Sequence, residues 1–121
     1  MIPSYVKKFL EEKNIRFIET DNLEEVASKV DVLYQTRIQK ERFPSLEEYE
    51  RAQGKYIIDQ GILNLMKQDA IILHPLPRAG EIAPEVDRDP RAAYFRQAQN
   101  GLYVRMALIH KCFEKLGFVR R

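Results

Sequence analysis

Apolar residues along the chain follow two different spacings, one typical of helices and one typical of strands. Recurrence at every third or fourth position predicts helices near 3–13, 22–27, 59–66 and 90–116, and a helix of about two turns from position 45. Alternation predicts a strand at 15–18, short apolar runs predict strands at 31–34 and 70–73, and 56–58 is expected to be a short strand or an extended piece. The polar stretch 36–44 and the proline-bearing stretch 75–89 have neither spacing, so they are expected to be loops.

Helices that alternate with short apolar strands indicate an α/β fold. We expect a three-layer sandwich in which a parallel sheet is covered by helices on both faces. Because the first predicted element is a helix, the sheet is expected to lack its first strand. The length of 121 residues suits one domain, covering 1–121. Asn22, Ser45 and Asp59 are expected to cap helices, and Gly101 is expected to interrupt the last helix or to permit a close contact.

Composition narrows the class of protein. Hydrophobic residues make up 45% of the chain and charged residues 31%, a mixture that can bury a core. The net charge of +2 is too small to favour nucleic acid or an anionic membrane as a partner, and no apolar run is long enough to span a membrane. The single cysteine, Cys112, excludes an intrachain disulfide and suits a reducing compartment. We therefore expect a soluble intracellular protein, in the cytoplasm or, if the complete precursor carries a targeting segment, in an organelle. The spacing of Cys and His predicts no metal site, and no cofactor is expected.

The first motif is His74-Pro75-Leu76-Pro77-Arg78, directly after the strand predicted at 70–73. Two prolines end the strand and leave carbonyl groups with few backbone partners. In open α/β sheets, ligands bind at the carboxyl ends of the strands. The motif is therefore a candidate binding loop.

The second motif begins after the strand predicted at 31–34 and runs from Gln35 to Phe43. Arg37 offers a planar fork of donors that suits a carboxylate. Gln39 lies two positions further on, so in an extended segment it points to the same side. Together they could bind a small dianion, although charged residues in a loop are also commonly just solvated.

These motifs closely resemble the carboxyl-terminal, aspartate-binding half of the aspartate carbamoyltransferases. The resemblance also covers most of the remaining chain, and its matching blocks are 31–43, 72–78, 81–98 and 100–108. In the related ornithine carbamoyltransferases the corresponding loop has the pattern His-Cys-Leu-Pro. This chain has Pro75 at the position of that cysteine. Arg37 also suits the side-chain carboxylate of aspartate better than the ammonium group of ornithine.

The resemblance implies transfer of the carbamoyl group from carbamoyl phosphate to L-aspartate. The products would be N-carbamoyl-L-aspartate and phosphate, in pyrimidine biosynthesis, without metal or cofactor. By resemblance, Arg37 binds the aspartate side-chain carboxylate and Gln39 hydrogen-bonds the substrate. The backbone carbonyls of Pro75 and Leu76 accept hydrogen bonds from the carbamoyl nitrogen or the incoming amine. The Leu76–Pro77 peptide bond is expected to be cis.

Other residues have supporting roles by resemblance. His74, Pro77, Arg78 and Arg105 are expected to support the loop. Lys40, Glu41 and Arg42 are expected to begin a mobile loop that closes over aspartate. Two alternatives stay open: His74 as a satisfied core histidine, and Arg105 as an ordinary structural ion-pair partner.

The chain departs from the family in what it lacks. A Ser-x-Arg-Thr phosphate loop is absent from the sequence, and in the family that loop and the arginine for the α-carboxylate lie upstream. We therefore expect an excised or alternatively started domain that is inactive alone. The resemblance implies that the complete enzyme would be a homotrimer. Self-association through residues 100–118 is expected. Alternative functions are a non-catalytic dicarboxylate-binding module and a truncated assembly element.

Overall fold

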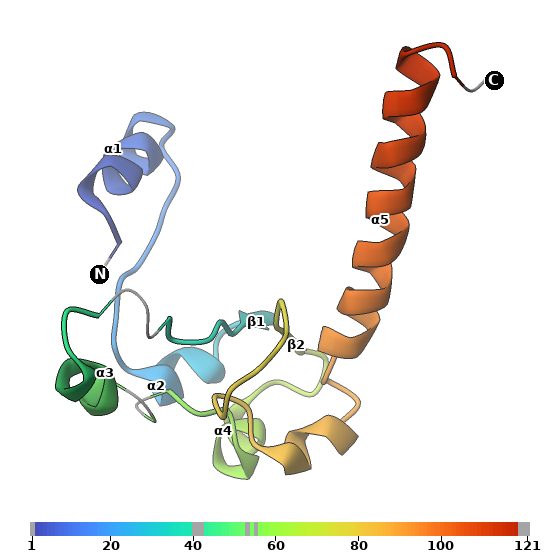
Figure 1. Cartoon of the computed structure of the whole chain (residues 1–121). Helices are drawn as coiled ribbons and strands as arrows, with labels where there is room; N and C mark the ends of the chain where they lie inside the picture. The colour runs from blue at the N-terminus through green and yellow to red at the C-terminus, as the bar shows by residue number, and fades with distance from the viewer. Residues whose placement is uncertain (1, 40–42, 53, 55, 119–121) are drawn as a thin grey trace.

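The computed structural model describes residues 2–39, 43–52, 54 and 56–118 (Figure 1). In chain order the elements are α1 (Ser4–Glu12), α2 (Leu23–Ala27), β1 (Val32–Tyr34), α3 (Leu46–Ala52), α4 (Gln60–Leu65), β2 (Ile71–Leu73), the 3-10 helix η2 (Pro84–Arg88) and α5 (Tyr94–Lys115).

The strands β1 and β2 pair in parallel, with Val32 opposite Ile71 and Tyr34 opposite Leu73. A parallel bridge between Ile72 and Ala92 lies at the other edge of β2. Parallel strands need a crossover connection, and here the crossover contains α3 and α4. The predicted α/β class, a parallel sheet accompanied by helices, is therefore confirmed.

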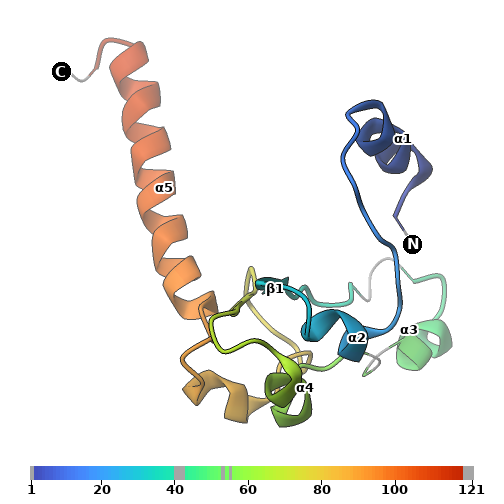
Figure 2. The same cartoon turned by 180° about the vertical axis from the view of Figure 1, so that it is seen from behind.

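The core lies where the sheet meets α2, α4 and η2, which Figure 2 shows gathered beneath the strands. Ile72 of β2 is fully buried, and Leu33 of β1 is almost so. These two side chains pack in one apolar cluster with Ile62 and Leu63 of α4 and Val86 of η2. Burial of such side chains is the main stabilising term for a fold of this kind.

The three predicted helix caps are confirmed. Asn22 Oδ1 accepts the backbone N–H of Glu25 at 3.1 Å, and Ser45 Oγ accepts that of Glu48 at 3.2 Å. Asp59 Oδ1 likewise accepts the N–H of Ile62 at 3.0 Å. Each side chain satisfies a donor of the first turn that has no intrahelical partner, which explains why these helices begin where they do.

The strand predicted at 15–18 is wrong, and the segment 56–58, expected to be a short strand or an extended piece, contributes a single bridge. Residues 15–18 form no strand among the described residues, and Ile18 is 89% exposed. In the segment 56–58 only Ile58 pairs, through a single bridge to Ile82. An alternating pattern gives the chain a face to bury, but a strand also needs a neighbouring strand for its backbone hydrogen bonds.

Gly101 does not interrupt the last helix, since α5 runs from Tyr94 to Lys115 without a break. Its good helix-forming neighbours override the propensity of one glycine.

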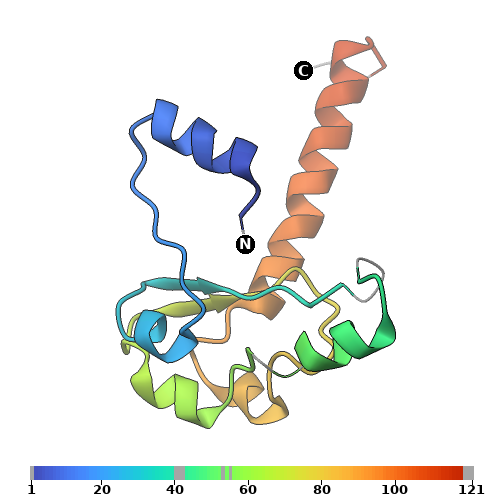
Figure 3. The same ribbon diagram turned by 90° about the vertical axis from the view of Figure 1, so that its left-hand side faces the viewer.

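α1 and α5 rise from the same side of the sheet and stand apart from each other (Figures 1 and 3). Both expose large apolar side chains, including Tyr5 and Phe9 on α1. On α5 the corresponding residues are Leu102, Tyr103, Val104, Met106, Leu108, Ile109 and Phe113. Among the described residues, no helix is both long and apolar enough to cross a membrane.

Candidate functional site

The two candidate motifs begin at the same edge of the sheet. Tyr34 and Leu73 are paired at the carboxyl ends of β1 and β2, and the backbone N–H of Gln35 donates to the carbonyl oxygen of Leu73 at 2.9 Å. Because the strands are parallel and in register, segments 35–39 and 74–78 leave the sheet together (Figure 3). This edge is where α/β sheets bind ligands.

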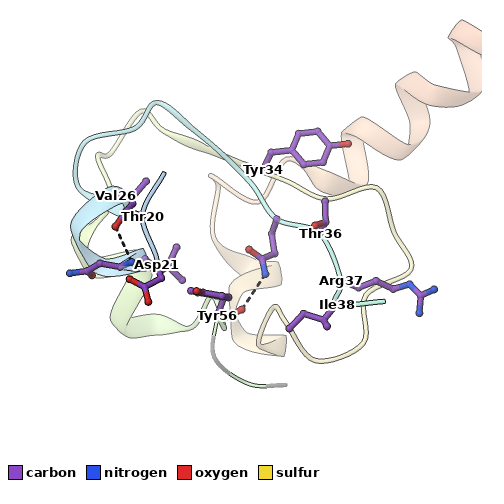
Figure 4. A pocket seen from close by; sticks show the side chains of 11 residues that line it. Thr20, Asp21, Val26, Tyr34, Thr36, Arg37, Ile38 and Tyr56 are labelled. Atoms are coloured by element: carbon purple, nitrogen blue, oxygen red, sulfur yellow. Dashed lines mark hydrogen bonds between the residues drawn. The ribbon is translucent and has the colours of Figure 1, made fainter. Parts of the chain in front are cut away.

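Arg37 lines a hollow of about 340 Å³ on the β1 side of this edge. The hollow is also lined by Tyr34, Gln35, Thr36, Ile38, Tyr56 and five residues from the segment 20–26. Gln35 Nε2 donates to the carbonyl oxygen of Tyr56 at 3.1 Å, which ties this segment to the chain before α4. Figure 4 shows the exposed Arg37 side chain extending away from Thr20 and Asp21.

Gln39 is half-buried and lies outside the lining of that hollow. Lys40, Glu41 and Arg42, the expected mobile loop, lie outside the described residues. Arg37 and Gln39, the two side chains expected to bind substrate, both follow β1 at this edge of the sheet, and their roles stay predictions.

His74 begins the second motif. Its ring is buried, and both ring nitrogens have hydrogen-bond partners. Its Nδ1 accepts the backbone N–H of Leu76 at 2.8 Å, so its Nε2 carries the hydrogen in the neutral ring. Nε2 in turn lies 2.6 Å from Glu81 Oε1. With 1% of the residue exposed and both ring nitrogens paired, His74 matches the core-histidine alternative and supports the loop.

Glu81 closes the far end of the same loop. Burial alone would raise the pKa of its carboxyl group, but hydrogen bonds from its own backbone N–H, from that of Ala79 and from His74 outweigh burial. The pKa therefore lies below its usual range. The group is a carboxylate at neutral pH and accepts the His74 hydrogen in that form.

Leu76 occupies an unusual backbone conformation, with φ of +48°. For a residue other than glycine this left-handed region costs about 1–2 kcal/mol. Its N–H is held by His74, and its side chain packs against the core cluster. The Leu76–Pro77 peptide bond is cis, as expected. Strained residues held by their surroundings are concentrated at functional sites, which favours this loop as the site.

Arg78 follows the prolines and ties the loop to η2 and α5. Its guanidinium donates through both terminal nitrogens to Asp87, with Nη2 at 2.6 Å from Oδ2, and it lies beside the hydroxyl of Tyr94. The Arg78 hydrogen bond lowers the pKa of Asp87. Burial, and then the hydrogen bond to Asp87, raise the pKa of Tyr94 to about 12. A support role fits these contacts better than a substrate role.

Arg105 lies on α5 beside the segment 74–81, which we call the proline loop. Its Nε donates to the carbonyl oxygen of Gly101 within the same helix, at 3.1 Å. With Pro75, His74 and Gln97 it lines a second hollow of about 380 Å³. The structure thus places Arg105 next to the loop, and its support of that loop remains a prediction.

Sequence reasoning missed Glu81, Asp87 and Gln97, which hold the loop through His74 and Arg78. Glu81 and Asp87 lie seven and nine positions from the residues they bind, and Gln97 lies 23 positions from His74, so no helix or strand spacing could have identified these contacts. The available signal was that all three residues lie in the block 81–98 that resembles the family. Among residues 2–39, 43–52, 54 and 56–118, no group of His, Cys, Asp and Glu could hold a metal ion.

Comparison with known proteins assigns the family. The model of the Asp/Orn-binding domain of aspartate/ornithine carbamoyltransferases matches residues 2–112. The chain is 54% identical over 110 residues to the aspartate carbamoyltransferase catalytic subunit of Clostridium novyi, covering 91% of this chain and 36% of the relative. It is 57% identical over 105 residues to a chloroplastic aspartate carbamoyltransferase of Pisum sativum, covering 86% and 27%.

Comparison with solved structures gives the same family. The catalytic subunit of M. jannaschii aspartate transcarbamoylase superposes with a TM-score of 0.83 at 44% identity, covering 94% of this chain and 38% of that one. The Trypanosoma cruzi enzyme in complex with carbamoyl phosphate and aspartate gives a TM-score of 0.76 at 40% identity, covering 88% and 36%. The chain thus spans about a third of the length of these relatives. It belongs to the aspartate/ornithine carbamoyltransferase family, in which it corresponds to the Asp/Orn-binding domain.

Proposed function

We propose that this chain is the aspartate-binding half of an aspartate carbamoyltransferase. The enzyme would transfer the carbamoyl group of carbamoyl phosphate to the amine of L-aspartate, giving N-carbamoyl-L-aspartate and phosphate for pyrimidine synthesis. The observation that carries the proposal is the shared sheet edge of Arg37 and the His74–Arg78 loop. The T. cruzi relative in complex with carbamoyl phosphate and aspartate supports the two substrates.

Within this proposal Arg37 binds the side-chain carboxylate of aspartate through its fork of N–H donors. Gln39 donates or accepts a further hydrogen bond and orients the amine. The carbonyl oxygens of Pro75 and Leu76 accept hydrogen bonds from the carbamoyl nitrogen or the attacking amine. Lys40, Glu41 and Arg42 close over the bound aspartate. Catalysis comes from placing the two reactants together and stabilising the charge that develops.

The 121 residues are proposed to be inactive by themselves. No Ser-x-Arg-Thr sequence occurs in the chain, and no phosphate-binding group is assigned among its residues. Carbamoyl phosphate would bind only when the other half of the enzyme is present. The proposed division therefore gives aspartate to this half and the phosphate to the other half.

We further propose that the complete enzyme is a homotrimer and that this chain alone self-associates through residues 100–118. The exposed apolar side chains of α5 support self-association, since a large apolar surface favours a partner. A reducing intracellular compartment is proposed as well, because Cys112 is free and exposed.

Two other functions remain as candidates. A binding module for dicarboxylates without chemistry would keep Arg37 and the proline loop and lack a phosphate loop, as this chain does. A truncated assembly element is favoured by the exposed face of α5. Aspartate binding separates the last candidate from the other two, because only an assembly element needs no aspartate site.

The test is a titration of the labelled chain with L-aspartate, followed by NMR. Saturable shifts of amides in segments 35–39 and 74–78 are expected, and Arg37→Ala should abolish them. Arg37→Lys keeps the charge and removes the fork, so it should weaken binding about tenfold or more. Arg16→Ala, another exposed arginine of an extended segment, is the matched control. No shift at millimolar aspartate in the wild type would overturn the proposed site.

A further inference from the structure

Gln97, in the first turn of α5, contacts the ends of both strands. Its Oε1 accepts the backbone N–H of His74 at 2.8 Å, the first N–H after β2. Its Nε2 donates to the hydroxyl of Tyr34 at 3.0 Å, on the last residue of β1. One half-buried side chain therefore bridges the two points at which the candidate binding segments begin.

The orientation of the Gln97 amide follows from its partners. A backbone N–H is a donor only, so the atom that faces His74 must be the oxygen. The nitrogen then faces Tyr34, whose hydroxyl oxygen accepts. The His74 N–H thus requires an acceptor, whereas the Tyr34 hydroxyl can either accept from a nitrogen or donate to an oxygen.

The start of α5 is itself fixed to the sheet by backbone hydrogen bonds. Ile72 N–H donates to the Arg91 carbonyl at 2.8 Å, and Ala93 N–H donates to the Ile72 carbonyl at 2.9 Å. Gln97 N–H then donates to the Ala93 carbonyl at 2.8 Å in the first helical turn. The Gln97 side chain thus projects from a backbone that β2 holds in place.

We propose that Gln97 is a positioning residue of the aspartate site. It fixes the start of the proline loop at His74 relative to the end of β1 at Tyr34. The spacing between Arg37 and the Pro75 and Leu76 carbonyls depends on these two points, so Gln97 sets how far apart the groups that bind aspartate lie. This inference rests on the proposed function and adds a residue that touches no substrate.

His74 links Gln97 to Leu76 inside the loop through two hydrogen bonds. The backbone of His74 is held by Gln97, and its ring holds the Leu76 N–H. Loss of the Gln97 bond would therefore displace the residue that sets the strained Leu76. A role limited to packing α5 on the sheet would not reach Leu76, because Tyr94 and the backbone bonds of Ile72 already supply that packing.

The experiment compares three variants of the 121-residue chain by NMR. Gln97→Met keeps the length and removes both hydrogen bonds. Gln97→Glu keeps an acceptor for His74, and the Tyr34 hydroxyl can donate to its second oxygen. Gln99→Met is the matched control: Gln99 lies on the same helix and donates to the Tyr103 hydroxyl at 3.1 Å, away from the loop. Amide exchange of His74 and Leu76 and the dissociation constant for L-aspartate are measured on each.

Gln97→Met should speed exchange of the His74 amide about tenfold, the effect of losing one net hydrogen bond. The same variant should weaken aspartate binding by a similar factor, while Gln97→Glu restores both values and Gln99→Met changes neither. Equal aspartate affinity in Gln97→Met and Gln99→Met would overturn the inference.

The failure of the proposed function would look different. If the wild type shows no aspartate shift, the aspartate site itself is wrong. The hydrogen-exchange rate of the His74 amide then decides whether Gln97 holds the loop. Faster exchange in Gln97→Met supports the contact between Gln97 and the loop, and an unchanged rate overturns it.

Discussion

His74 Nε2 lies 2.6 Å from Glu81 Oε1, and this contact joins the two ends of the proline loop. The carboxylate is largely buried, with 10% of its side chain exposed, and the imidazole is fully buried. The pair therefore closes a loop whose conformation would otherwise depend on Pro75, Pro77 and the strained backbone of Leu76. The loop's shape depends on a contact between residues seven positions apart.

Glu81→Ala should lower the free energy of unfolding by about 2 kcal/mol, because it leaves the buried Nε2–H of His74 without an acceptor. Glu85→Ala is the control, since Glu85 is an exposed carboxylate of the neighbouring η2. Urea denaturation of both variants measures the difference. Equal free energies for the two variants would show that the His74–Glu81 contact contributes nothing.

Acid should destabilise the chain through three carboxylates. The Arg91 hydrogen bond lowers the pKa of Asp89, as the Arg78 bond lowers that of Asp87, and hydrogen bonds lower that of Glu81 despite its burial. A carboxyl group whose pKa is lower in the folded state than in the unfolded state stabilises the fold at pH values above its unfolded pKa. That unfolded pKa is 4.5 for Glu and 3.8 for Asp. That stability is lost as pH falls through the folded values.

Urea denaturation at several pH values below about 5 measures this loss. The free energy of unfolding should fall steadily toward acid, and Asp87→Asn should reduce the slope. A flat profile over that range would contradict the account of these three carboxylates.

Tyr94 should ionise at a higher pH than an ordinary tyrosine. Its pKa is raised to about 12 from the ordinary 10.0, by burial first and then by Asp87. Since the folded pKa is raised, Tyr94 contributes stability below the unfolded value of 10.0 and loses it as pH rises toward about 12. Ultraviolet absorbance of phenolate during an alkaline titration should show a late step, absent in Tyr94→Phe. Persistence of that step in Tyr94→Phe would assign it elsewhere.

The helix α5 should make the chain self-associate as its concentration rises. Leu108 and Ile109 are each 58% exposed on this helix, and apolar surface of that extent favours a partner. Replacing both by Glu should shift the chain toward monomer in sedimentation equilibrium. Gln99→Glu adds a charge on the same helix outside the apolar residues and is the control. A wild type that stays monomeric at high concentration would contradict self-association.

Local patterns were sufficient for much of the fold. Asn22, Ser45 and Asp59 could be recognised as caps because a cap is a contact between residues three apart. The β1 and β2 strands could be recognised because their apolar runs are buried on at least one face. Segment 15–18 has the same kind of pattern, but a pattern cannot say whether a strand partner is present.

The candidate site could also be predicted from the sequence only in part. Arg37 and the His74–Arg78 loop could be identified from their motifs and from the resemblance they carry. Gln97 could not, because its two contacts join residues 23 and 63 positions away. Long-range contacts of this kind depend on how α5 starts from the sheet, which no local spacing encodes.

The most direct test of the central claim is formation of N-carbamoyl-L-aspartate by the purified chain, alone and mixed with a separately made carbamoyl phosphate half of a relative. We expect product only in the mixture, and Arg37→Ala should remove it while Arg16→Ala should not. Product from the 121-residue chain alone would contradict the division of the two substrates between halves. No product in the mixture, with both halves folded, would contradict the assignment of this chain as a competent aspartate-binding half.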